Sequence, residues 1–501
     1  MTNRSTKGIW KVISASSMGT MIEWYDFYIF GSLAVVISTK FFPSDNPTAA
    51  FLSTLATFAA GFVVRPFGAL FFGRLGDLIG RKYTFMVTLL LMGGATFLIG
   101  CIPSYETIGF MAPLLVLVLR LLQGLALGGE YGGAATYVAE HAPVGQRGYW
   151  TSWIQTTATV GLFISLMVIL ATKNVLSAEE FDAWGWRVPF WVSIIMVGVS
   201  YMIRKNMSES PVFAKAKSEG NTSTNPLKES FGNRYNLKFV LLALFGATMG
   251  QGVVWYTGQF YAMSFMKTVM SIDSSQVDTL LGIALILGTP FFIVFGWLSD
   301  KVGRKYIMMG GMLLAILLYR PIYKSMYETT NVKNKTELTE KTTLLAVLKE
   351  NKNQTMDSIY TTNKTYADGT TFLEVKTVSL ENGKVKIVDG KPKVETKTTV
   401  TINSYDRWIL IFLIFVQVLF VTMVYGPIAA FLVEMFPVKI RYTSMSLPYH
   451  VGNGIFGGLL PAISTYFVTH AKDAGDPEFY LEGLWYPIVI ASVSFVVGMI
   501  Y

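Results

Sequence analysis

Two carboxylates three residues apart are the first candidates for chemistry in this chain. Glu23 and Asp26 lie in an apolar segment that we expect to be helical, and their spacing places them on one helix face. Neighbouring carboxylates push their pKa values apart, so one can hold a proton while the other stays ionised. The pair therefore predicts proton coupling, and Tyr25 between them is a candidate substrate contact. The alternative is a fixed ion pair with another helix.

Basic and polar groups in two further apolar segments could pair with these acids or bind a ligand. Arg65 precedes a proline in the second segment, and the fourth segment carries Arg120, Gln123 and Glu130. Charges inside a membrane span are costly and usually face a partner or an aqueous cavity. The guanidinium groups of Arg65 and Arg120 match a substrate carboxylate, and Gln123 and Glu130 follow Arg120 in the same segment. All four residues are predicted substrate contacts. Ion pairing with the two acids is the alternative.

Polar side chains in later segments could form a second wall of the same site. Gln251 and Tyr256 follow helical spacing in the seventh segment, and Asn453 lies in the eleventh. Amides and aromatic rings together are typical of small-molecule sites. His450, beside Asn453, could titrate near physiological pH, although a hydrogen-bonded packing role fits it better. We predict substrate contacts for Gln251, Tyr256 and Asn453.

One polar string occurs twice among the elements that must position these residues. Residues 73–83 and 296–306 share Gly, Leu, Asp, Gly, Arg, Lys and Tyr at the same seven places. Each copy follows one long apolar segment and precedes another. A polar loop repeated at matching points of two hydrophobic halves is typical of a duplicated membrane transporter.

Composition supports an all-α membrane protein. Hydrophobic residues make up 52% of the chain and charged residues only 15%. A helix needs about 20 apolar residues to cross the hydrocarbon core. Glycines at four-residue spacing in the fourth segment predict close helix packing. We expect twelve spans: 12–38, 50–72, 84–102, 113–138, 149–172, 187–204, 238–266, 277–298, 306–324, 407–432, 444–469 and 484–501.

Loop charges and composition divide the chain into parts. Lys and Arg gather in alternate connections, which predicts that both termini and the central loop face the cytoplasm. We expect an N-terminal six-helix bundle at 1–204 and a cytoplasmic central loop at 205–237. A C-terminal six-helix bundle at 238–501 is interrupted by an external insert at 327–405.

The insert alternates Thr, Val and Lys, which is typical of strands. Asp368-Gly369, Asn382-Gly383 and Asp389-Gly390 are candidate hairpin turns. We therefore expect a small external module with short β-strands and one helical turn near 342–350. A disordered loop is the alternative.

Several classes of protein are excluded. The net charge of +9 comes from short loops between spans, so it reflects topology rather than nucleic-acid binding. The single cysteine, Cys101, cannot form an intrachain disulfide, and no metal-ligand spacing is present. Neither a phosphate-binding Gly-rich loop nor a nucleophile with its base is recognisable. We expect no enzyme activity, no cofactor and no ATP drive.

Four strings carry a resemblance to a known family. They are Glu23-Trp-Tyr-Asp-Phe27, Arg65-Pro-Phe-Gly68, Gly128-Gly-Glu-Tyr-Gly-Gly133 with Val138-Ala-Glu140, and Arg441-Tyr-Thr-Ser-Met-Ser-Leu-Pro-Tyr449. With the repeated loop and Arg120-Leu-Leu-Gln-Gly124, they resemble the metabolite:proton symporter family of the major facilitator superfamily. The resemblance implies two pseudo-symmetric six-helix bundles and rocker-switch alternating access.

The resemblance also implies a latch on the cytoplasmic side. Asp77 with Arg81 and Lys82 matches the signature loop of the first half. In the second half the matching residues are Asp300, Arg304 and Lys305. An Asp in this place can accept hydrogen bonds at a helix N-terminus and pair with the Arg four residues on. The external insert and the lack of a long C-terminal tail depart from the family, so osmotic gating is not expected.

These features predict a secondary active transporter in a bacterial inner membrane. It would carry a small carboxylate or zwitterion together with protons, as a multi-pass monomer. One charge moved through 100 mV is worth about 2.3 kcal/mol, enough for roughly fifty-fold accumulation. The alternative is a transporter-like receptor that uses the external insert as its sensor.

Overall fold

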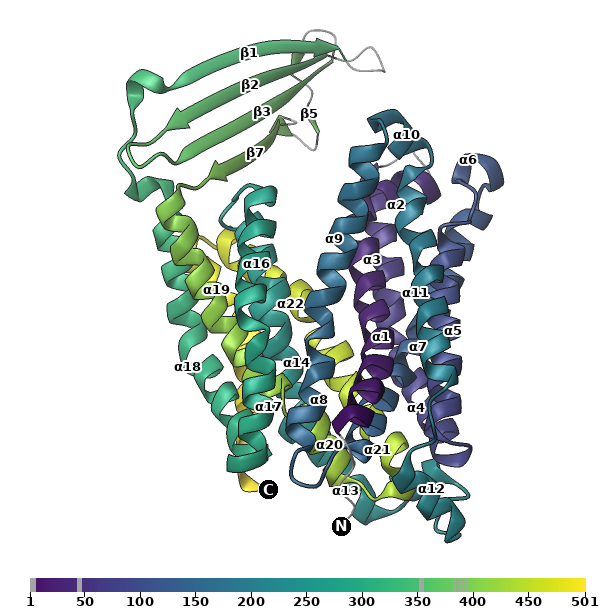
Figure 1. Cartoon of the computed structure of the whole chain (residues 1–501). Coiled ribbons are helices and arrows are strands. Elements are labelled where there is room, and N and C mark those ends of the chain that lie inside the picture. The colour runs from purple at the N-terminus through teal and green to yellow at the C-terminus, as the bar shows by residue number, and fades with distance from the viewer. Residues whose placement is uncertain are drawn as a thin grey trace.

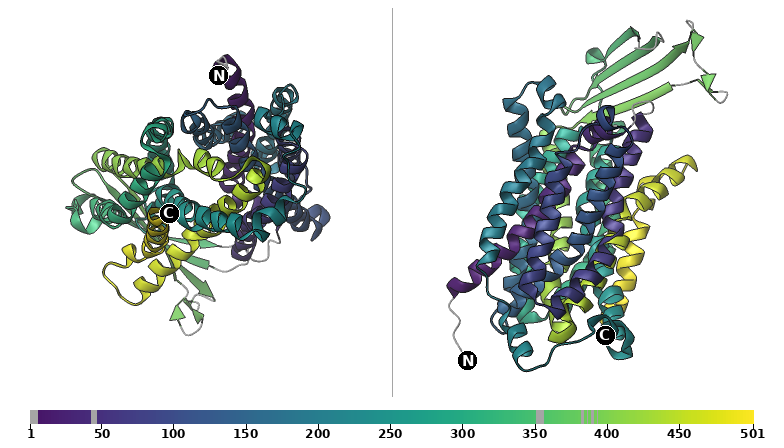
Figure 2. Two further views of the ribbon diagram at one scale, coloured as in Figure 1. Left: turned by 90° about the horizontal axis from the view of Figure 1, so that it is seen from below. Right: turned by 90° about the vertical axis from the view of Figure 1, so that its right-hand side faces the viewer.

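The computed structural model describes residues 6–42, 47–350, 356–381, 384–385, 387–388, 391–392 and 394–501. Long helices run side by side, and antiparallel strands lie at one end of the molecule, above α16 (Ser274–Gly288), α18 (Arg304–Thr330) and α19 (Ser404–Tyr425) (Figure 1). The start of α1 (Thr6–Ser32) and the C-terminal end of α24 (Trp485–Ile500) lie towards the opposite end from the sheet (Figures 1 and 2). The helices therefore cross the same thickness repeatedly, as membrane spans do.

The first part of the chain, up to residue 218, is mainly helical. Its longer helices are α1 (Thr6–Ser32), α2 (Ala34–Phe41), α3 (Pro47–Val63), α4 (Arg65–Leu78), α5 (Arg81–Ile99), α7 (Met111–His141), α8 (Arg147–Gln155), α9 (Thr157–Val175) and α11 (Val188–Lys205). Shorter helices α6 (Tyr105–Ile108), α10 (Ala178–Ala183) and α12 (Pro211–Ser218) lie at the ends. With a rise of about 1.5 Å per residue, α7 alone is long enough to cross a bilayer.

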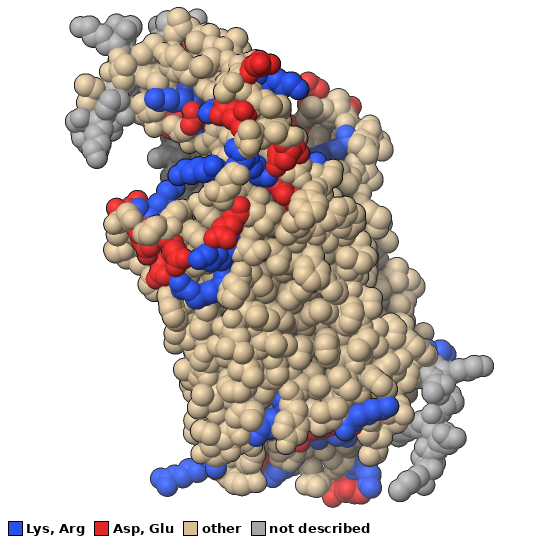
Figure 3. Space-filling model, turned by 90° about the vertical axis from the view of Figure 1, so that its left-hand side faces the viewer, with Lys and Arg blue, Asp and Glu red and all other residues tan. Residues whose placement is uncertain are grey.

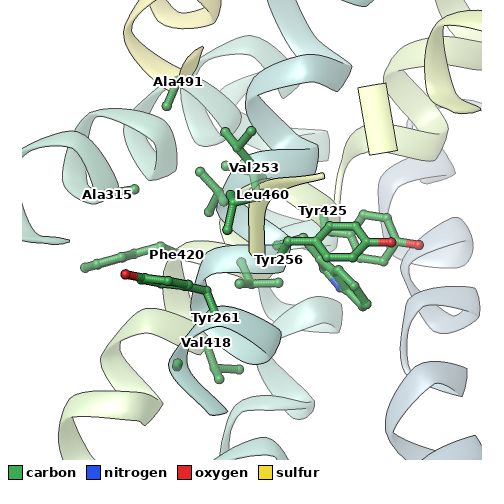
Figure 4. Packing of buried hydrophobic residues seen from close by; sticks show 14 of the residues in the cluster. Val253, Tyr256, Tyr261, Ala315, Val418, Phe420, Tyr425, Leu460 and Ala491 are labelled. Carbon is green, nitrogen blue, oxygen red and sulfur yellow. The ribbon is translucent and has the colours of Figure 1, made fainter. Parts of the chain in front are cut away.

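The second part of the chain is also mainly helical. Its helices are α13 (Arg234–Ala243), α14 (Met249–Tyr256), α15 (Ala262–Thr268), α16 (Ser274–Gly288), α17 (Pro290–Val302), α18 (Arg304–Thr330), α19 (Ser404–Tyr425), α20 (Ile428–Met435), α21 (Arg441–Val451), α22 (Leu460–Asp473), α23 (Phe479–Glu482) and α24 (Trp485–Ile500). Buried side chains of α14, α18, α19 and α24 share one hydrophobic cluster, seen in part in Figure 4.

The helices have the composition of membrane spans. Among the described residues, ten are long and apolar enough to cross a membrane, and one bent pair raises that number to eleven at most. The bent pair joins α1 to α2 at an angle of 67°. On the face drawn in Figure 3, Lys, Arg, Asp and Glu lie towards the two ends and leave an uncharged belt between them. That belt is the surface expected to contact lipid tails.

Glycines let α7 pack tightly, as its four-residue spacing predicted. A Cβ added at Gly124 would lie 2.1 Å from the carbonyl oxygen of Gly61. One at Gly128 would lie 2.2 Å from the carbonyl oxygen of Arg65. Backbone thus meets backbone where α7 crosses α3 and α4. This close crossing fixes the depth of Arg65 relative to α7.

The insert forms an antiparallel sheet anchored to the second part of the chain. Its strands are β1 (Thr343–Glu350), β2 (Met356–Thr365), β3 (Thr371–Glu381), β4 (Lys384–Val385), β5 (Ile387–Val388), β6 (Lys391–Pro392) and β7 (Val394–Thr401). Of the strands described, five form one sheet, in which β2 lies between β1 and β3, and β3 also pairs with β7 and β4; β5 and β6 form a separate two-stranded sheet. Hydrogen bonds between Val400 and the loop at 271–273 tie β7 to the helices below.

In the insert, one predicted turn is confirmed and one predicted helical turn is wrong. Gly369 has a φ of 87° in the turn between β2 and β3, as the Asp368-Gly369 signal predicted. The helical turn expected near 342–350 is wrong, because those residues form β1 and pair in register with β2. Tertiary pairing outweighed the local helix preference of the Leu-Leu-Ala run. Asn382-Gly383 and Asp389-Gly390 lie outside the described residues.

Candidate functional site

An ion pair between α1 and α4 lies at the centre of the candidate site. Arg65 Nη1 is 3.4 Å from Glu23 Oε1, and the two side chains are only 13% and 9% exposed. The helix break after Val63 makes Arg65 the first residue of α4. The guanidinium also lies 4.3 Å above the ring of Phe62. This single long contact is the one hydrogen bond found for the Glu23 carboxylate among the described residues.

Tyrosines from both parts of the chain face this pair. Tyr131 of α7 stacks on Tyr449 of α21 with ring centroids 3.7 Å apart. The Tyr449 hydroxyl lies 2.8 Å from that of Tyr425, and Gln155 Nε2 donates to the Tyr131 hydroxyl at 2.8 Å. Glu23 interacts electrostatically with all three tyrosines. The site is therefore shared between helices far apart in sequence.

The predicted residues of α14 lie on the same side of the site. Tyr256 interacts electrostatically with Arg65 and Glu23, and it lies beside Tyr425 at one edge of the hydrophobic cluster (Figure 4). Gln251 and Asn453 exchange two side-chain hydrogen bonds of 3.1 and 2.9 Å. The structure thus brings Tyr256 to the ion pair, and it joins Gln251 to Asn453 within the second part of the chain.

An aromatic layer separates this centre from the sheet end. Trp24 lies 4.9 Å from Trp255, and Phe27 lies 5.1 Å from Phe260, measured between ring centroids. Tyr28 stacks on the same Phe260. α1 and the α14–α15 segment therefore meet through rings. Ring contacts can separate without leaving buried polar groups unpaired, so this layer can open at low cost.

Asp26 belongs to a second, separate cluster. Its carboxylate accepts hydrogen bonds from Arg120 at 2.9 Å, Gln123 at 2.9 Å and Thr96 at 3.0 Å. All four residues come from α1, α5 and α7 and are buried. The alternative of a fixed ion pair therefore describes the geometry of Asp26, whereas Glu23 keeps a looser partner.

Glu130 forms a third group together with Arg204, for which the sequence predicted no contact. Arg204 Nη2 lies 2.6 Å from Glu130 Oε1, and Thr88 donates to the other carboxylate oxygen at 2.7 Å. Arg204, the last residue of the sixth predicted span, is 1% exposed and lies inside the helices. A basic residue at the end of an apolar run carries no sequence signal for burial. Tyr25 also points elsewhere, donating to the Pro189 carbonyl at 2.6 Å.

The latch residue Asp77 ends α4 and reaches the start of α21. Its carboxylate accepts from the backbone N–H of Tyr442 at 3.3 Å and of Thr443 at 2.9 Å. The Thr443 hydroxyl donates to it at 2.8 Å, and Arg81 lies 3.0 Å away. A buried carboxylate thus caps a helix N-terminus contributed by the other part of the chain.

Asp300 repeats this arrangement in the opposite direction. It accepts from the backbone N–H of Gly148 at 2.9 Å and of Tyr149 at 2.7 Å, at the start of α8. Arg304 lies 2.6 Å from Asp300 and also contacts Glu434 at 3.0 Å. The two copies of the repeated loop therefore cap helices in each other's half.

The remaining latch residues have different partners. Lys82 donates to the Lys205 carbonyl and Lys305 to the Met499 carbonyl, each within its own half. Sequence reasoning assigned no contact to Glu140, which binds Arg441 at 2.8 Å across the halves. Glu140 and Arg441 both stood in the family-like strings, which was the available signal.

These cross-connections lie at one end of the molecule. Arg81, Asp77, Glu140 and Asp300 join the halves at the end away from the sheet. Nearer the sheet, the hydroxyls of Thr159 and Thr289 meet at 2.7 Å at mid-depth. The structure is therefore closed at the latch end. Among the described residues, no group of three His, Cys, Asp or Glu side chains could hold a metal ion.

Helices of this length, buried charges between them and a double helix-capping latch define a multi-pass membrane transporter. Residues 11–233 match the family model described as "Sugar (and other) transporter". The inner membrane metabolite transport protein YhjE of Escherichia coli (strain K12) is 38% identical over 308 residues, which cover 60% of this chain and 68% of that protein. The chain belongs to the major facilitator superfamily, as its motifs predicted.

Two further comparisons extend over nearly the whole chain. The citrate-proton symporter of Salmonella typhi is 28% identical over 481 residues, covering 95% of this chain and 92% of that protein. The structure of the proton:xylose symporter XylE bound to 6-bromo-6-deoxy-D-glucose shares the fold, with a TM-score of 0.67 and 15% identity. It covers 98% of this chain and 94% of that chain.

Proposed function

We propose that this protein is a proton-coupled symporter that takes up a small organic metabolite, either a carboxylate or a zwitterion. The names of two similar proteins, a citrate-proton symporter and a proton:xylose symporter, support proton coupling. Arg65 would bind a substrate carboxylate, and the surrounding rings could cover its apolar or ammonium part.

The proposed architecture has twelve spans in two six-helix bundles, at 1–204 and 238–501. Within the part of the chain that the structure describes, ten helices and the bent α1–α2 pair are long and apolar enough for eleven spans, and α3 together with α4 would form the twelfth. The loop at 205–237 would join the bundles on the cytoplasmic side and the insert at 327–405 would lie outside. The start of α1 and the C-terminal end of α24 lie opposite the sheet, and basic loops gather at that end, which supports this orientation (Figure 1).

The observation that carries the proposal is the contrast between the two acids. Three hydrogen bonds of 2.9–3.0 Å hold Asp26, whereas among the residues that the structure describes the Glu23 carboxylate has one polar contact, of 3.4 Å with Arg65. Protonation of Glu23 would remove its attraction for Arg65 and free the guanidinium for a substrate carboxylate. Proton and substrate would then bind together, which is the requirement for symport. Asp26 and Arg120 would hold α1 against α7.

Alternating access would exchange the latch for contacts at the sheet end. Asp77 and Asp300 would hold the cytoplasmic end closed while the aromatic layer covers the site from the sheet end, so we assign the structure to an occluded state that opens outward when the rings separate. The rings of Trp24, Trp255 and Phe260 would separate to admit the substrate. Release to the cytoplasm requires both helix caps to break, after which the rings and the outer helix ends close.

The test uses purified protein in proteoliposomes, with a substrate first identified by thermal shift among dicarboxylates, citrate, proline and betaine. Glu23→Gln should abolish accumulation driven by a proton gradient and keep exchange of labelled substrate. Asp26→Asn is the matched control, and it should lower both activities together because it disturbs packing. Accumulation by Glu23→Gln at the parent level would contradict the proposed coupling role.

A further inference from the structure

A groove runs along the outer surface between α13 and α24. Its walls are formed by Arg234, Leu237, Lys238, Leu241, Leu242 and Phe245 on one side and by Val493, Val497 and Tyr501 on the other, and it encloses about 450 Å³. Both helices belong to the second part of the chain, so the groove does not depend on the contacts between halves. It lies away from the Glu23–Arg65 pair and plays no part in the proposed transport step.

The spacing of the lining residues gives the groove its direction and length. On α13 and the π-helical turn after it, Leu237, Leu241 and Phe245 follow each other at four-residue intervals, and Val493 and Val497 do the same on α24. Eleven residue steps from Arg234 to Phe245 span about 16 Å at 1.5 Å per residue. One leaflet of a bilayer has a hydrocarbon thickness of about 15 Å. The groove is therefore as long as one acyl chain in one leaflet.

The two ends of the groove differ in chemistry. Arg234 and Lys238, one helical turn apart and both exposed, lie at the end near the latch, and Leu241 and Phe245 lie deeper in the membrane belt. In the described part of the chain neither basic group is neutralised by a carboxylate; Lys238 Nζ lies 5.0 Å above the ring of Tyr501. Cations and a tyrosine at the interface, above an apolar slot, match a phosphate headgroup with its tail.

We propose that this groove binds an anionic phospholipid of the leaflet on the latch side. Arg234 and Lys238 hold the phosphate, and one acyl chain lies between α13 and α24 against Leu241 and Val493. A neutral zwitterionic lipid gains less, because its choline group opposes the two cations. The bound lipid lies beside a close contact between α24 and the π-helical turn that follows α13, since a Cβ at Gly498 would lie 2.6 Å from the Gly246 carbonyl oxygen.

Native mass spectrometry of the purified full chain tests the site. Phosphatidylglycerol and phosphatidylcholine with the same acyl chains are titrated against the parent and against Arg234→Gln combined with Lys238→Gln. A basic group near an anionic lipid contributes about fivefold in affinity, so the double variant should bind phosphatidylglycerol about thirtyfold more weakly. The matched control, Lys215→Gln with Lys217→Gln, removes two exposed charges from α12 at the same end and should bind within about twofold of the parent.

Two further arms distinguish a lipid from a free phosphate. Val493→Trp fills the slot without changing charge, at a side chain that is 45% exposed, and should lower phosphatidylglycerol binding while the melting temperature stays unchanged. Glycerol 3-phosphate should not displace the lipid. Equal binding of the two lipids, parent-like binding by the Arg234/Lys238 double variant, or displacement by glycerol 3-phosphate would each overturn the proposal.

Discussion

Replacing Asp77 by Asn should open the latch end of the transporter. The carboxylate is fully buried, accepts three hydrogen bonds from Tyr442 and Thr443, and pairs with Arg81. An amide keeps one acceptor oxygen but presents an N–H group to backbone donors and removes the charge that faces the start of α21. A hydrogen bond to a charged group contributes about 1.5–3 kcal/mol, and the charge at a helix N-terminus about 1 kcal/mol more.

The closed state should therefore lose about 3 kcal/mol relative to the open state, which is roughly a hundredfold shift in their ratio. A cysteine at Ser446 would report it, because Ser446 is fully buried on α21 and lies against Gly132 of the opposite half. In a Cys101→Ser background, the rate of maleimide labelling at this cysteine in nanodiscs should rise by a similar factor. The Cys101→Ser change removes the chain's own cysteine, so the introduced cysteine is the one that reacts.

Two controls frame this experiment. Asp300→Asn, in the second copy of the loop, should also raise labelling because it uncaps α8. Asp182→Asn removes an exposed pair with Lys40 at the sheet end and should leave the rate unchanged. Labelling of Asp77→Asn within twofold of the parent would refute the reasoning that helix capping holds the closed state.

Two other perturbations follow from the buried and exposed charges. Arg204→Met should lower the free energy of unfolding by about 3–5 kcal/mol in chemical denaturation, because it leaves Glu130 charged and buried; a loss under 1 kcal/mol would contradict this. Although burial opposes it, hydrogen bonds from Lys335 and Thr370 hold the pKa of Asp368 below its usual range. The stabilisation that ionised Asp368 gives to the β2–β3 turn is therefore fully present above the pKa of Asp368 in the unfolded chain. It is lost as pH falls through the lower pKa of Asp368 in the folded protein. The rate of backbone hydrogen exchange at the turn, corrected for the intrinsic rate, should increase in the parent when the pH is lowered from 7 to 3. In Asp368→Asn this rate should be high at both pH values.

The sequence was sufficient for the class of fold because membrane spans are specified locally. A run of about 20 apolar residues has few ways to satisfy its backbone other than a helix across the bilayer. The repeated loop with Asp77 and Asp300 likewise specified a duplicated transporter before any contact was known. The insert was harder, because strand pairing is set by partners distant in sequence, and β1 was expected to contain a helical turn.

The sequence alone determined which residues could be charged inside the membrane and on which helix face each lies, since helical spacing follows from covalent geometry. Only the tertiary structure decided how these charges are paired. Asp26 and Glu23 share a face, yet the Asp26 carboxylate is enclosed by Arg120, Gln123 and Thr96, whereas the Glu23 carboxylate, within the described part of the chain, is hydrogen-bonded to Arg65 alone. Arg204, at the end of its span, is drawn inward by Glu130. Such pairings depend on how helices cross, and crossing is fixed by contacts such as Gly128 against Arg65 that no single segment encodes.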